Sequence, residues 1–372
     1  MVVRLHLIFS VVSLWQLAFA FPNNATFSNG PRKIGKRCTG TIESLADIPD
    51  AEECTTINIG GFTVPAGGTS LPLPSISMSG ELTFAFEAWA GPLMVISGND
   101  VTFNGNNHVL NGNGPSYWDG LGGNGGIQKP APMIQLNMGG TFENVKIQNS
   151  PTRAVAVSGT GLTLTSITVD NSAGAAANSA SGGKPAGANT DGFDVAANDV
   201  IIQDSTVINQ DDCLAINRGT TIVFENNSCS GGHGISIGSI SSDVTVSDVT
   251  ISGNTVTNNV NGLRIKTDAT ATGSTVNGIT FTNNKLSGIT QFGVIIDQSY
   301  PSTLATPGTG VIVENVVFSG TNTISVASDA HRVEVNCGST SSCPGTMDFS
   351  GLTVTGGLEG AIVHATLSGG SF

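Results

Sequence analysis

The chain has 372 residues and a formal net charge of −13. From residue 38 onward it carries 9 Lys and Arg against 27 Asp and Glu, a balance of −18. Such a chain does not favour non-specific binding to nucleic acid or to anionic membranes, and it repels an acidic polysaccharide unless positive charge gathers where the polymer lies.

The first residues have the layout of a secretory signal peptide. Arg4 precedes an apolar run that ends in the small-residue cleavage signal Ala18-Phe-Ala20. The run is shorter than the ~20 apolar residues of a membrane-spanning helix. Residues 21–37 end in the dibasic pair Lys36-Arg37, which is typical of a pro-segment. We therefore expect a signal peptide over residues 1–20, a pro-segment over 21–37 and a secreted, extracellular protein.

The part after the pro-segment favours many short strands. Residues 42–54 could form a short N-terminal helix, whereas the rest of the chain is rich in Val, Thr and Ser, with Gly and Asn at the turns. A four-residue strand motif recurs at intervals of 21, 21, 28 and 31 residues, beginning at Gly192, Cys213, Gly234, Gly262 and Gly293. A second series of short strands runs beside it, at residues 145–147, 167–169, 206–208 and 254–256.

Repeats of this length indicate a solenoid, in which each repeat is one coil. With several short strands per coil, the pattern predicts an all-β, right-handed parallel β-helix over residues 38–372, as one domain. A propeller would need a longer repeat of about 40 residues, and a sandwich has no reason for equal spacing. The helix over 42–54 would cover one open end of the solenoid.

Acidic residues and a histidine stand immediately before the repeated motifs. The equal spacing of 21 places Asp191, Asp212 and His233 in one column, on neighbouring rungs about 4.8 Å apart. Asp211 precedes Asp212. Because neighbouring residues of a strand point to opposite faces, both carboxylates can reach one cleft only if the backbone bends there.

Two cations follow in the same column. The i, i+2 spacing of Arg264 and Lys266 puts both on one face of a strand. Carboxylates that lie close together raise one another's pKa, which supplies the protonated acid and the ionised carboxylates that glycoside hydrolysis needs. A single Asp at a coil turn is better explained as a cap for backbone N–H groups. Three Asp, a His and two cations together predict an active site.

The cysteines fall in three neighbouring pairs. An even number behind a signal peptide favours disulfides, and pairing of neighbours is the simplest connectivity. No Cys-x-x-Cys with matching histidines occurs, which argues against a metal site at the cysteines. Because carboxylates and cations of the protein can supply the chemistry, we predict no metal and no cofactor. Asn226-Asn-Ser228 is a predicted glycosylation sequon. The predicted disulfide partners are Cys38 with Cys54, Cys213 with Cys229, and Cys337 with Cys343.

These motifs together resemble the polygalacturonases, pectin-degrading glycoside hydrolases on a right-handed parallel β-helix. The segment Ser230 to Ser239 is similar to fungal endopolygalacturonases, and the resemblance covers essentially all of residues 38–372. The motifs, which occur in the family's order, are Asn189-Thr-Asp191, Gln210-Asp-Asp212, Gly232-His-Gly234 and Arg264-Ile-Lys266, followed by Tyr300.

The resemblance implies a role for each residue in endo-acting, inverting hydrolysis of α-1,4-galacturonosyl linkages. Asp211 would protonate the glycosidic oxygen, and His233 would tune its charge state. Asp191 and Asp212 would activate the attacking water. The residues implied to bind substrate are Arg264, Lys266, Tyr300, Asn189 and Gln210.

Other functions remain open at this point. An exo-acting or rhamnogalacturonan-cutting enzyme of the same family is one alternative, although Arg264-Ile-Lys266 favours galacturonate on the leaving side. A pectate lyase would need Ca²⁺ in the acidic cluster, but Ca²⁺ prefers oxygen ligands and the column contains His233. A non-catalytic, polysaccharide-binding β-helix would bind without releasing reducing ends. We expect a monomer whose partner is polygalacturonate.

Overall fold

The computed structural model describes residues 36–71 and 75–372. The predicted signal peptide (1–20) and residues 21–35 of the predicted pro-segment lie outside the described residues. Within the described ranges, no helix is long and apolar enough to cross a membrane.

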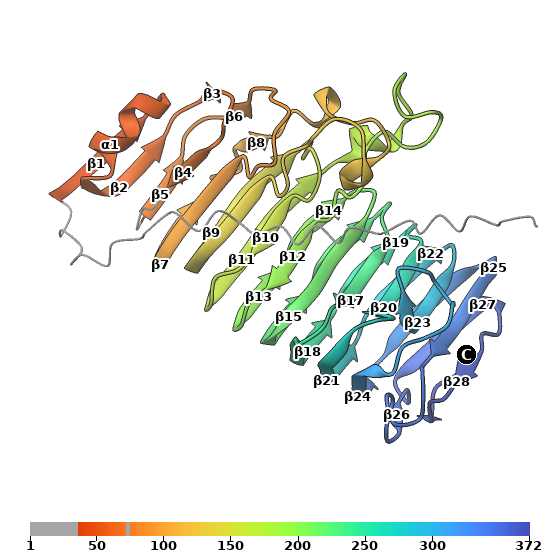
Figure 1. Cartoon of the computed structure of the whole chain (residues 1–372). Helices are drawn as coiled ribbons and strands as arrows, with labels where there is room; N and C mark the ends of the chain where they lie inside the picture. Colours follow the sequence, from red (N-terminus) through yellow and green to blue (C-terminus); the bar gives the residue numbers. More distant parts are fainter. Residues whose placement is uncertain (1–35, 72–74) are drawn as a thin grey trace, which may run out of the picture. The chain divides into compact units, whose positions relative to one another are not determined.

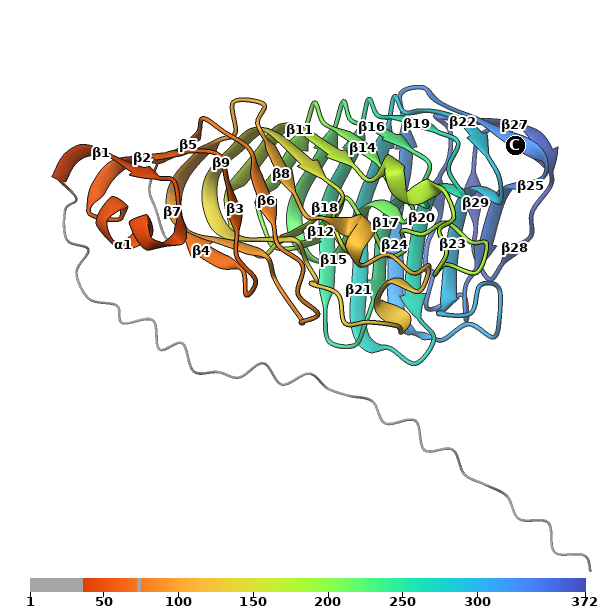
Figure 2. The same ribbon diagram turned by 90° about the horizontal axis from the view of Figure 1, so that it is seen from above.

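The described residues form the predicted right-handed parallel β-helix, in which every strand pairing is parallel and the strands make three columns (Figures 1 and 2). The first column contains β4 (Thr69–Leu71), β7 (Met94–Asn104), β9 (Ile134–Gln148), β10 (Val155–Val157), β12 (Phe193–Ala196), β15 (Asp212–Glu225), β17 (Gly234–Ile240), β20 (Asn261–Asp268), β23 (Phe292–Tyr300), β25 (Asn322–Asn336) and β28 (Ile362–Val363).

The long strands β7, β15 and β25 bend and serve two columns each, and β9 passes through all three. The second column adds β1 (Lys36–Ile42), β2 (Cys54–Ile59), β5 (Ser75–Met78), β11 (Leu162–Asp170), β13 (Val200–Gln203), β18 (Thr245–Ser252), β21 (Thr272–Thr282), β24 (Gly310–Ser319), β26 (Met347–Asp348) and β29 (Leu367–Ser368). The third adds β3 (Phe62–Val64), β6 (Leu82–Phe84), β8 (Val109–Asn111), β14 (Thr206–Ile208), β16 (Ser228–Ser230), β19 (Thr255–Thr257), β22 (Lys285–Ile289) and β27 (Leu352–Leu358).

Both repeats read from the sequence lie where they were predicted. The five motifs of the first series lie on β12, β15, β17, β20 and β23, which pair in that order. The second series lies in the third column, where Ile167 pairs with Val145 and Thr168 pairs with Thr206. The series omitted one rung, the strand β16 that lies between β14 and β19.

A single residue in the left-handed conformation turns the corner between the second and third columns. This conformation disfavours most side chains, but Asn, Asp and Gly adopt it readily. Asn amides just inside the corner then form a buried ladder, in which the amide oxygen of Asn254 accepts from the N–H of Asn227 at 2.9 Å, and Asn284 repeats the contact to Asn254. The corner residues in successive coils are Asn144, Ser166, Asp204, Asn226, Gly253, Asn283 and Gly320.

The interior is a stack of apolar side chains because alternate residues of each strand point inward. In β11, for example, the leucines, isoleucine and valine are buried and the threonines are less so. Phenylalanines of neighbouring coils stack on one another, with ring centroids 4.9 Å apart for Phe103 and Phe142 and 4.8 Å for Phe281 and Phe318. The core therefore fixes the register of the coils, and with it the positions of the outward-facing residues.

The predicted N-terminal helix is shorter than expected. The 3₁₀ turn η1 (Leu45–Asp47) and helix α1 (Ile48–Ala51) occupy the middle of the predicted range, because β1 extends through Ile42 and β2 begins at Cys54. Ala51 is buried, and Leu45 and Ile48 pack against the core of the first coil. The remaining 3₁₀ turns are η2 (Gly114–Ser116), η3 (Gly122–Asn124) and η4 (Ser172–Ala175).

The three predicted disulfides are present. Cys38–Cys54 joins β1 to the start of β2, Cys213–Cys229 joins two strands of neighbouring columns, and Cys337–Cys343 closes a short loop after β25. Each bond therefore links residues that are close in the sequence, as neighbour pairing predicts.

Candidate active site

A cavity of about 490 Å³ lies on the outer face of the first column. Residues from successive coils line it, so the cavity runs along the stack of strands. It brings together eight of the nine predicted site residues, namely Asn189, Asp191, Asp211, Asp212, His233, Arg264, Lys266 and Tyr300. The ninth, Gln210, is not among the lining residues.

The backbone bends at the acidic pair as the sequence required. Asp212 pairs with Gly234 and Leu214 pairs with Ile235, so β15 has one residue more than β17 at this point. Such an irregularity changes the direction in which neighbouring side chains point. As a result Asp211, which precedes the strand, and Asp212, its first residue, both face the cavity.

Asp212 is the most enclosed carboxylate of the site, with a side chain only 1% exposed. Lys266 Nζ donates to its Oδ2 at 2.7 Å, and Arg264 Nη2 donates to its Oδ1. The hydroxyl of Ser236 also donates to Oδ1, at 3.0 Å, and in turn accepts from Arg264 Nε. Two cations therefore offset the negative charge of this buried carboxylate.

Asp211 is paired with His233. Its Oδ1 lies 3.0 Å from His233 Nδ1 and accepts the backbone N–H of Asp212 at 2.8 Å, while its Oδ2 accepts from Asn189 Nδ2 at 3.2 Å. Burial by itself raises the pKa of Asp211, but the hydrogen bond and charge of His233 outweigh burial and lower it. Burial by itself lowers the pKa of His233, and the contact with Asp211 reverses this and raises it.

Asp191 has the opposite electrostatic environment. Burial, followed by the negative charges of Asp211, Asp194 and Asp212, raises its pKa well above the usual value for an aspartate. In the empty cavity, therefore, Asp191 has a raised affinity for a proton, whereas the proton affinity of Asp211 is lowered. Because these groups interact strongly, they titrate as a set rather than one by one.

Asp211, Asp212 and His233 could in principle hold a metal ion, since one ligand atom from each lies within 4.8 Å of the others. Both oxygens of Asp212 already accept from cations, however, and Asp211 is bonded to His233. Protein donors thus neutralise this cluster, which favours a reaction that uses protein groups alone.

Known proteins resemble the chain over nearly its whole length. Residues 54–368 match the family model described as glycosyl hydrolases family 28. The chain belongs to glycosyl hydrolase family 28. It is therefore a glycoside hydrolase, and the carboxylates of the cavity are the groups that its chemistry requires.

Two curated relatives and one solved structure illustrate the match. An endo-polygalacturonase of Sclerotinia sclerotiorum is 42% identical, over 95% of this chain and 96% of that protein. A probable endopolygalacturonase A of Aspergillus fumigatus is 39% identical, over 98% of each chain. The structure of endopolygalacturonase I from Stereum purpureum, complexed with two galacturonate, is 46% identical, with a TM-score of 0.84 over 89% of this chain and 99% of that one.

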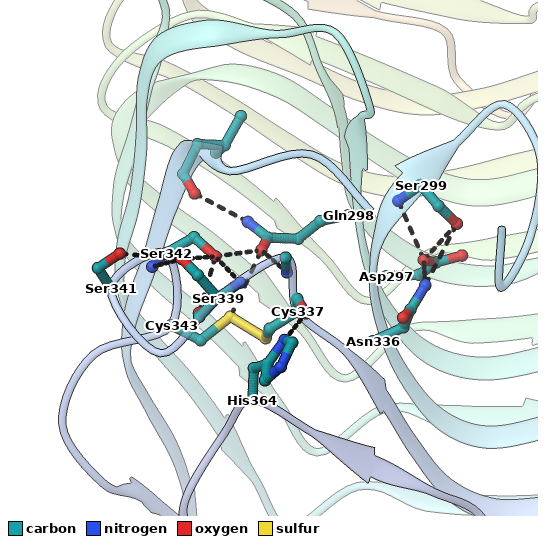
Figure 3. The surroundings of a disulfide bond; sticks show 12 residues. Asp297, Gln298, Ser299, Asn336, Cys337, Ser339, Ser341, Ser342, Cys343 and His364 are labelled. Atoms are coloured by element: carbon teal, nitrogen blue, oxygen red, sulfur yellow. Dashed lines mark hydrogen bonds between the residues drawn. A yellow bond between two sulfur atoms is a disulfide. The ribbon is translucent and has the colours of Figure 1, made fainter. Parts of the chain in front are cut away.

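In this family 28 chain Tyr300 lies at the far end of the cavity from Asn189, with its ring centroid 5.2 Å from Lys266 Nζ. The buried Asp297 anchors the segment that follows Tyr300, because its Oδ2 accepts the N–H of Leu304 at 2.9 Å. The Oδ1 of Asp297 accepts from Ser299, through N–H and hydroxyl, and from Asn336 (Figure 3). Asp297 thus holds the backbone on both sides of Tyr300, at Ser299 and at Leu304.

A second anchor joins this region to the last disulfide. Figure 3 shows Gln298 beside Cys337 and Cys343; its Oε1 accepts from the hydroxyl of Ser342 at 2.8 Å, and its Nε2 donates to the carbonyl of Val311. Asp297 therefore connects β23 to the segment after Tyr300, and Gln298 connects it to β24 and to the loop of the last disulfide. No local pattern in the sequence indicated this role, because the partners lie as far as 45 residues away along the chain.

Two residues predicted to bind substrate make contacts within the protein instead. The amide of Gln210 donates to the carbonyl of Asn171 and accepts from the hydroxyl of Thr190, so it secures the loop before β12. Asn189 lines the cavity, but its Oδ1 accepts from Gly123 N and Asn124 Nδ2 while its Nδ2 donates to Asp211. We therefore expect both residues to position the acids.

Sequence reasoning missed Arg153 and Asp194, which also line the cavity. Their side chains form an ion pair at 3.2 Å. Burial raises the pKa of Asp194 to about 6, opposed by the charge of Arg153. A signal was available for Arg153, because it is one of only nine cations after residue 37.

Proposed function

We propose that this enzyme is an endopolygalacturonase, which hydrolyses α-1,4-galacturonosyl linkages within polygalacturonate. The observation that supports this most directly is the cavity itself, in which three of the four lining carboxylates, those of Asp191, Asp211 and Asp212, are grouped with Arg264 and Lys266. The carboxylates supply acid and base for glycoside hydrolysis, and the cations supply contacts for a substrate that carries a carboxylate on each sugar. The names of its relatives at about 40% identity support the same substrate and the same internal mode of cleavage.

In the proposed reaction Asp211 donates a proton to the oxygen of the leaving sugar, and Asp191 and Asp212 activate the attacking water. Asp212 is suited to a base because Arg264 and Lys266 contact both of its carboxylate oxygens and orient it. Asp211 is suited to proton transfer because His233, itself a titratable group, contacts it directly. Arg264, Lys266 and Tyr300 bind the galacturonate beside the scissile bond.

The proton must move to Asp211 when substrate binds, because in the empty cavity the pKa of Asp211 is lowered and that of Asp191 is raised. Bound uronate brings negative charge and removes water, and both effects raise the pKa of a nearby carboxyl. If the uronate contacts Arg264 and Lys266, these two cations interact with the uronate as well as with Asp212. Substrate binding therefore shifts proton affinity within the set of three carboxylates towards the acid.

We also propose that the protein is exported as a monomer and that Asn226 carries a glycan. Asn226 is exposed at a left-handed corner of the β-helix, outside the cavity, so a glycan there would not obstruct the substrate. The predicted signal peptide supports export.

The test is to incubate the protein with polygalacturonic acid and to follow viscosity and reducing ends together. An endo-acting enzyme produces a steep loss of viscosity while few reducing ends have formed. A slow fall in viscosity for the same number of ends would indicate an exo-acting enzyme. A product that absorbs ultraviolet light would indicate a lyase, and binding without new ends would indicate a non-catalytic protein.

A further inference from the structure

The cavity contains a third cation, Arg153, that differs from Arg264 and Lys266 in its surroundings. Three of the nine Lys and Arg residues after position 37 line the cavity, although the chain is acidic overall. The side chains of Arg264 and Lys266 are only 16% and 11% exposed and are bound to Asp212, whereas that of Arg153 is 45% exposed. Arg153 is therefore the cavity cation most accessible to a ligand.

Arg153 is nevertheless held in a fixed position. Its Nη1 donates to Oδ2 of Asp194 at 3.2 Å, and the side chain of Asp194 is only 9% exposed. A guanidinium has five N–H donors in a planar fork, so one such contact leaves a donor pair for a second carboxylate. An exposed ion pair alone contributes little to stability, which gives Arg153 little structural purpose at this place.

The position of Arg153 along the β-helix is on the opposite side of the acids from the other two cations. Ala154 N–H donates to the carbonyl of Asp191, so Arg153 lies one rung before Asp191 in the first column. Arg264 lies two rungs beyond Asp212, through the pairing of Ser236 with both Ala215 and Arg264. Cations thus flank the reacting carboxylates at both ends of the cavity.

We propose that Arg153 binds the carboxylate of a galacturonate on the side of the scissile bond opposite to Arg264 and Lys266, and that Asp194 positions it. This inference rests on the proposed function, because it takes an oligogalacturonate as the ligand. Arg153 is a specificity-determining residue: it favours substrates that are free of methyl ester at that sugar, and it fixes which bond of an oligomer lies at the carboxylates.

The experiment compares Arg153→Gln, which removes the charge, with Arg153→Lys, which retains it. Lys146→Gln is the matched control, since it removes one exposed charge on β9 in the third column. The substrates are hexagalacturonate labelled at its reducing end and polygalacturonate with increasing methyl esterification. Thermal unfolding of each variant is measured alongside.

For Arg153→Gln we expect kcat/KM on hexagalacturonate to fall at least about tenfold, the factor typical of a charge-assisted contact. The bond that is cut should move towards the end of the oligomer that occupied the Arg153 side, because the other cations still hold the opposite part. The loss of kcat/KM in Arg153→Gln should become smaller as the methyl esterification of the polymer rises. Arg153→Lys should retain much of the activity. Lys146→Gln should match the unmodified enzyme.

Two results would overturn the proposal. One is that Arg153→Gln cuts the oligomer at the same bond and loses kcat/KM by the same factor on free and on esterified polymer. That pattern would indicate a purely structural role for Arg153. The other is an unaltered kcat/KM in that variant. Failure of the proposed function itself looks different, because the unmodified enzyme would then release no reducing ends from polygalacturonate.

Discussion

His233 Nδ1 lies 3.0 Å from Oδ1 of Asp211, so the proposed proton donor is directly linked to a second titratable group. This imidazolium–carboxylate pair is complete below the usual pKa of histidine and is lost as pH rises through the raised pKa of His233. The enzyme should therefore be most active at acidic pH, with an alkaline limb set by His233.

The corresponding variants are His233→Gln, which removes the ionisation, and His233→Ala, which also removes the hydrogen bond. We expect kcat to fall by on the order of 10²-fold and the alkaline limb to shift or disappear. The pH dependence of kcat and of kcat/KM measures this. A profile with the same alkaline limb in both variants would show that His233 does not control the acid.

Lys266→Asn should raise KM on polygalacturonate strongly. A charge-assisted contact to a carboxylate is typically worth about 1.5–3 kcal/mol, which corresponds to roughly tenfold or more in affinity. The effect on kcat should be smaller, because Arg264 and Ser236 still hold Asp212. Steady-state kinetics of Lys266→Asn are compared with those of Lys285→Asn, which changes an exposed lysine on β22. Equal KM values for the two variants would refute the role of Lys266.

Activity should survive a strong chelator. Arg264, Lys266 and His233 already occupy the carboxylates that could bind a metal, so the reaction needs none. Release of reducing ends is measured before and after treatment with EDTA and dialysis. Loss of activity that Ca²⁺ restores would favour the lyase instead.

Asp297→Ala should loosen the segment after Tyr300. The variant loses the acceptor of four hydrogen bonds from Ser299, Leu304 and Asn336, and buried donors left without partners cost about 1–3 kcal/mol of unfolding free energy each. We expect a lower unfolding temperature and a raised KM, with a smaller change in kcat. Asp329→Asn, at an exposed position, is the control; an unfolding temperature and KM in Asp297→Ala that equal those of this control would contradict the anchor.

Hydrolysis should invert the anomeric carbon. In an inverting site a water lies between acid and base, whose carboxyls are about 6.5–9.5 Å apart, whereas a retaining pair sits at about 5–5.5 Å. We assign the acid to Asp211 and the water to Asp191 and Asp212, and the remaining carboxylate, Asp194, is paired with Arg153, so no residue is assigned as nucleophile. NMR of the earliest products, before mutarotation, should show β-configured reducing ends from the α-linked substrate; α-configured ends would exclude these roles.

The sequence by itself determined the fold and most of the active site. Equal spacing of strand motifs specifies stacked coils, because each coil must place its apolar residues over those of the last. The same spacing placed Asp191, Asp212 and His233 along one face, and the neighbour pairing of the cysteines was also correct.

Only the tertiary structure decided how those residues interact. The extra residue in β15 turns Asp211 and Asp212 into one cavity, a local irregularity that a repeat of 21 does not specify. The contacts of Arg153 with Asp194 and of Lys266 with Asp212 join residues 41 and 54 positions apart. Periodicity gives the rung on which a side chain lies, but burial, charge pairing and proton affinity depend on all the groups that meet in three dimensions.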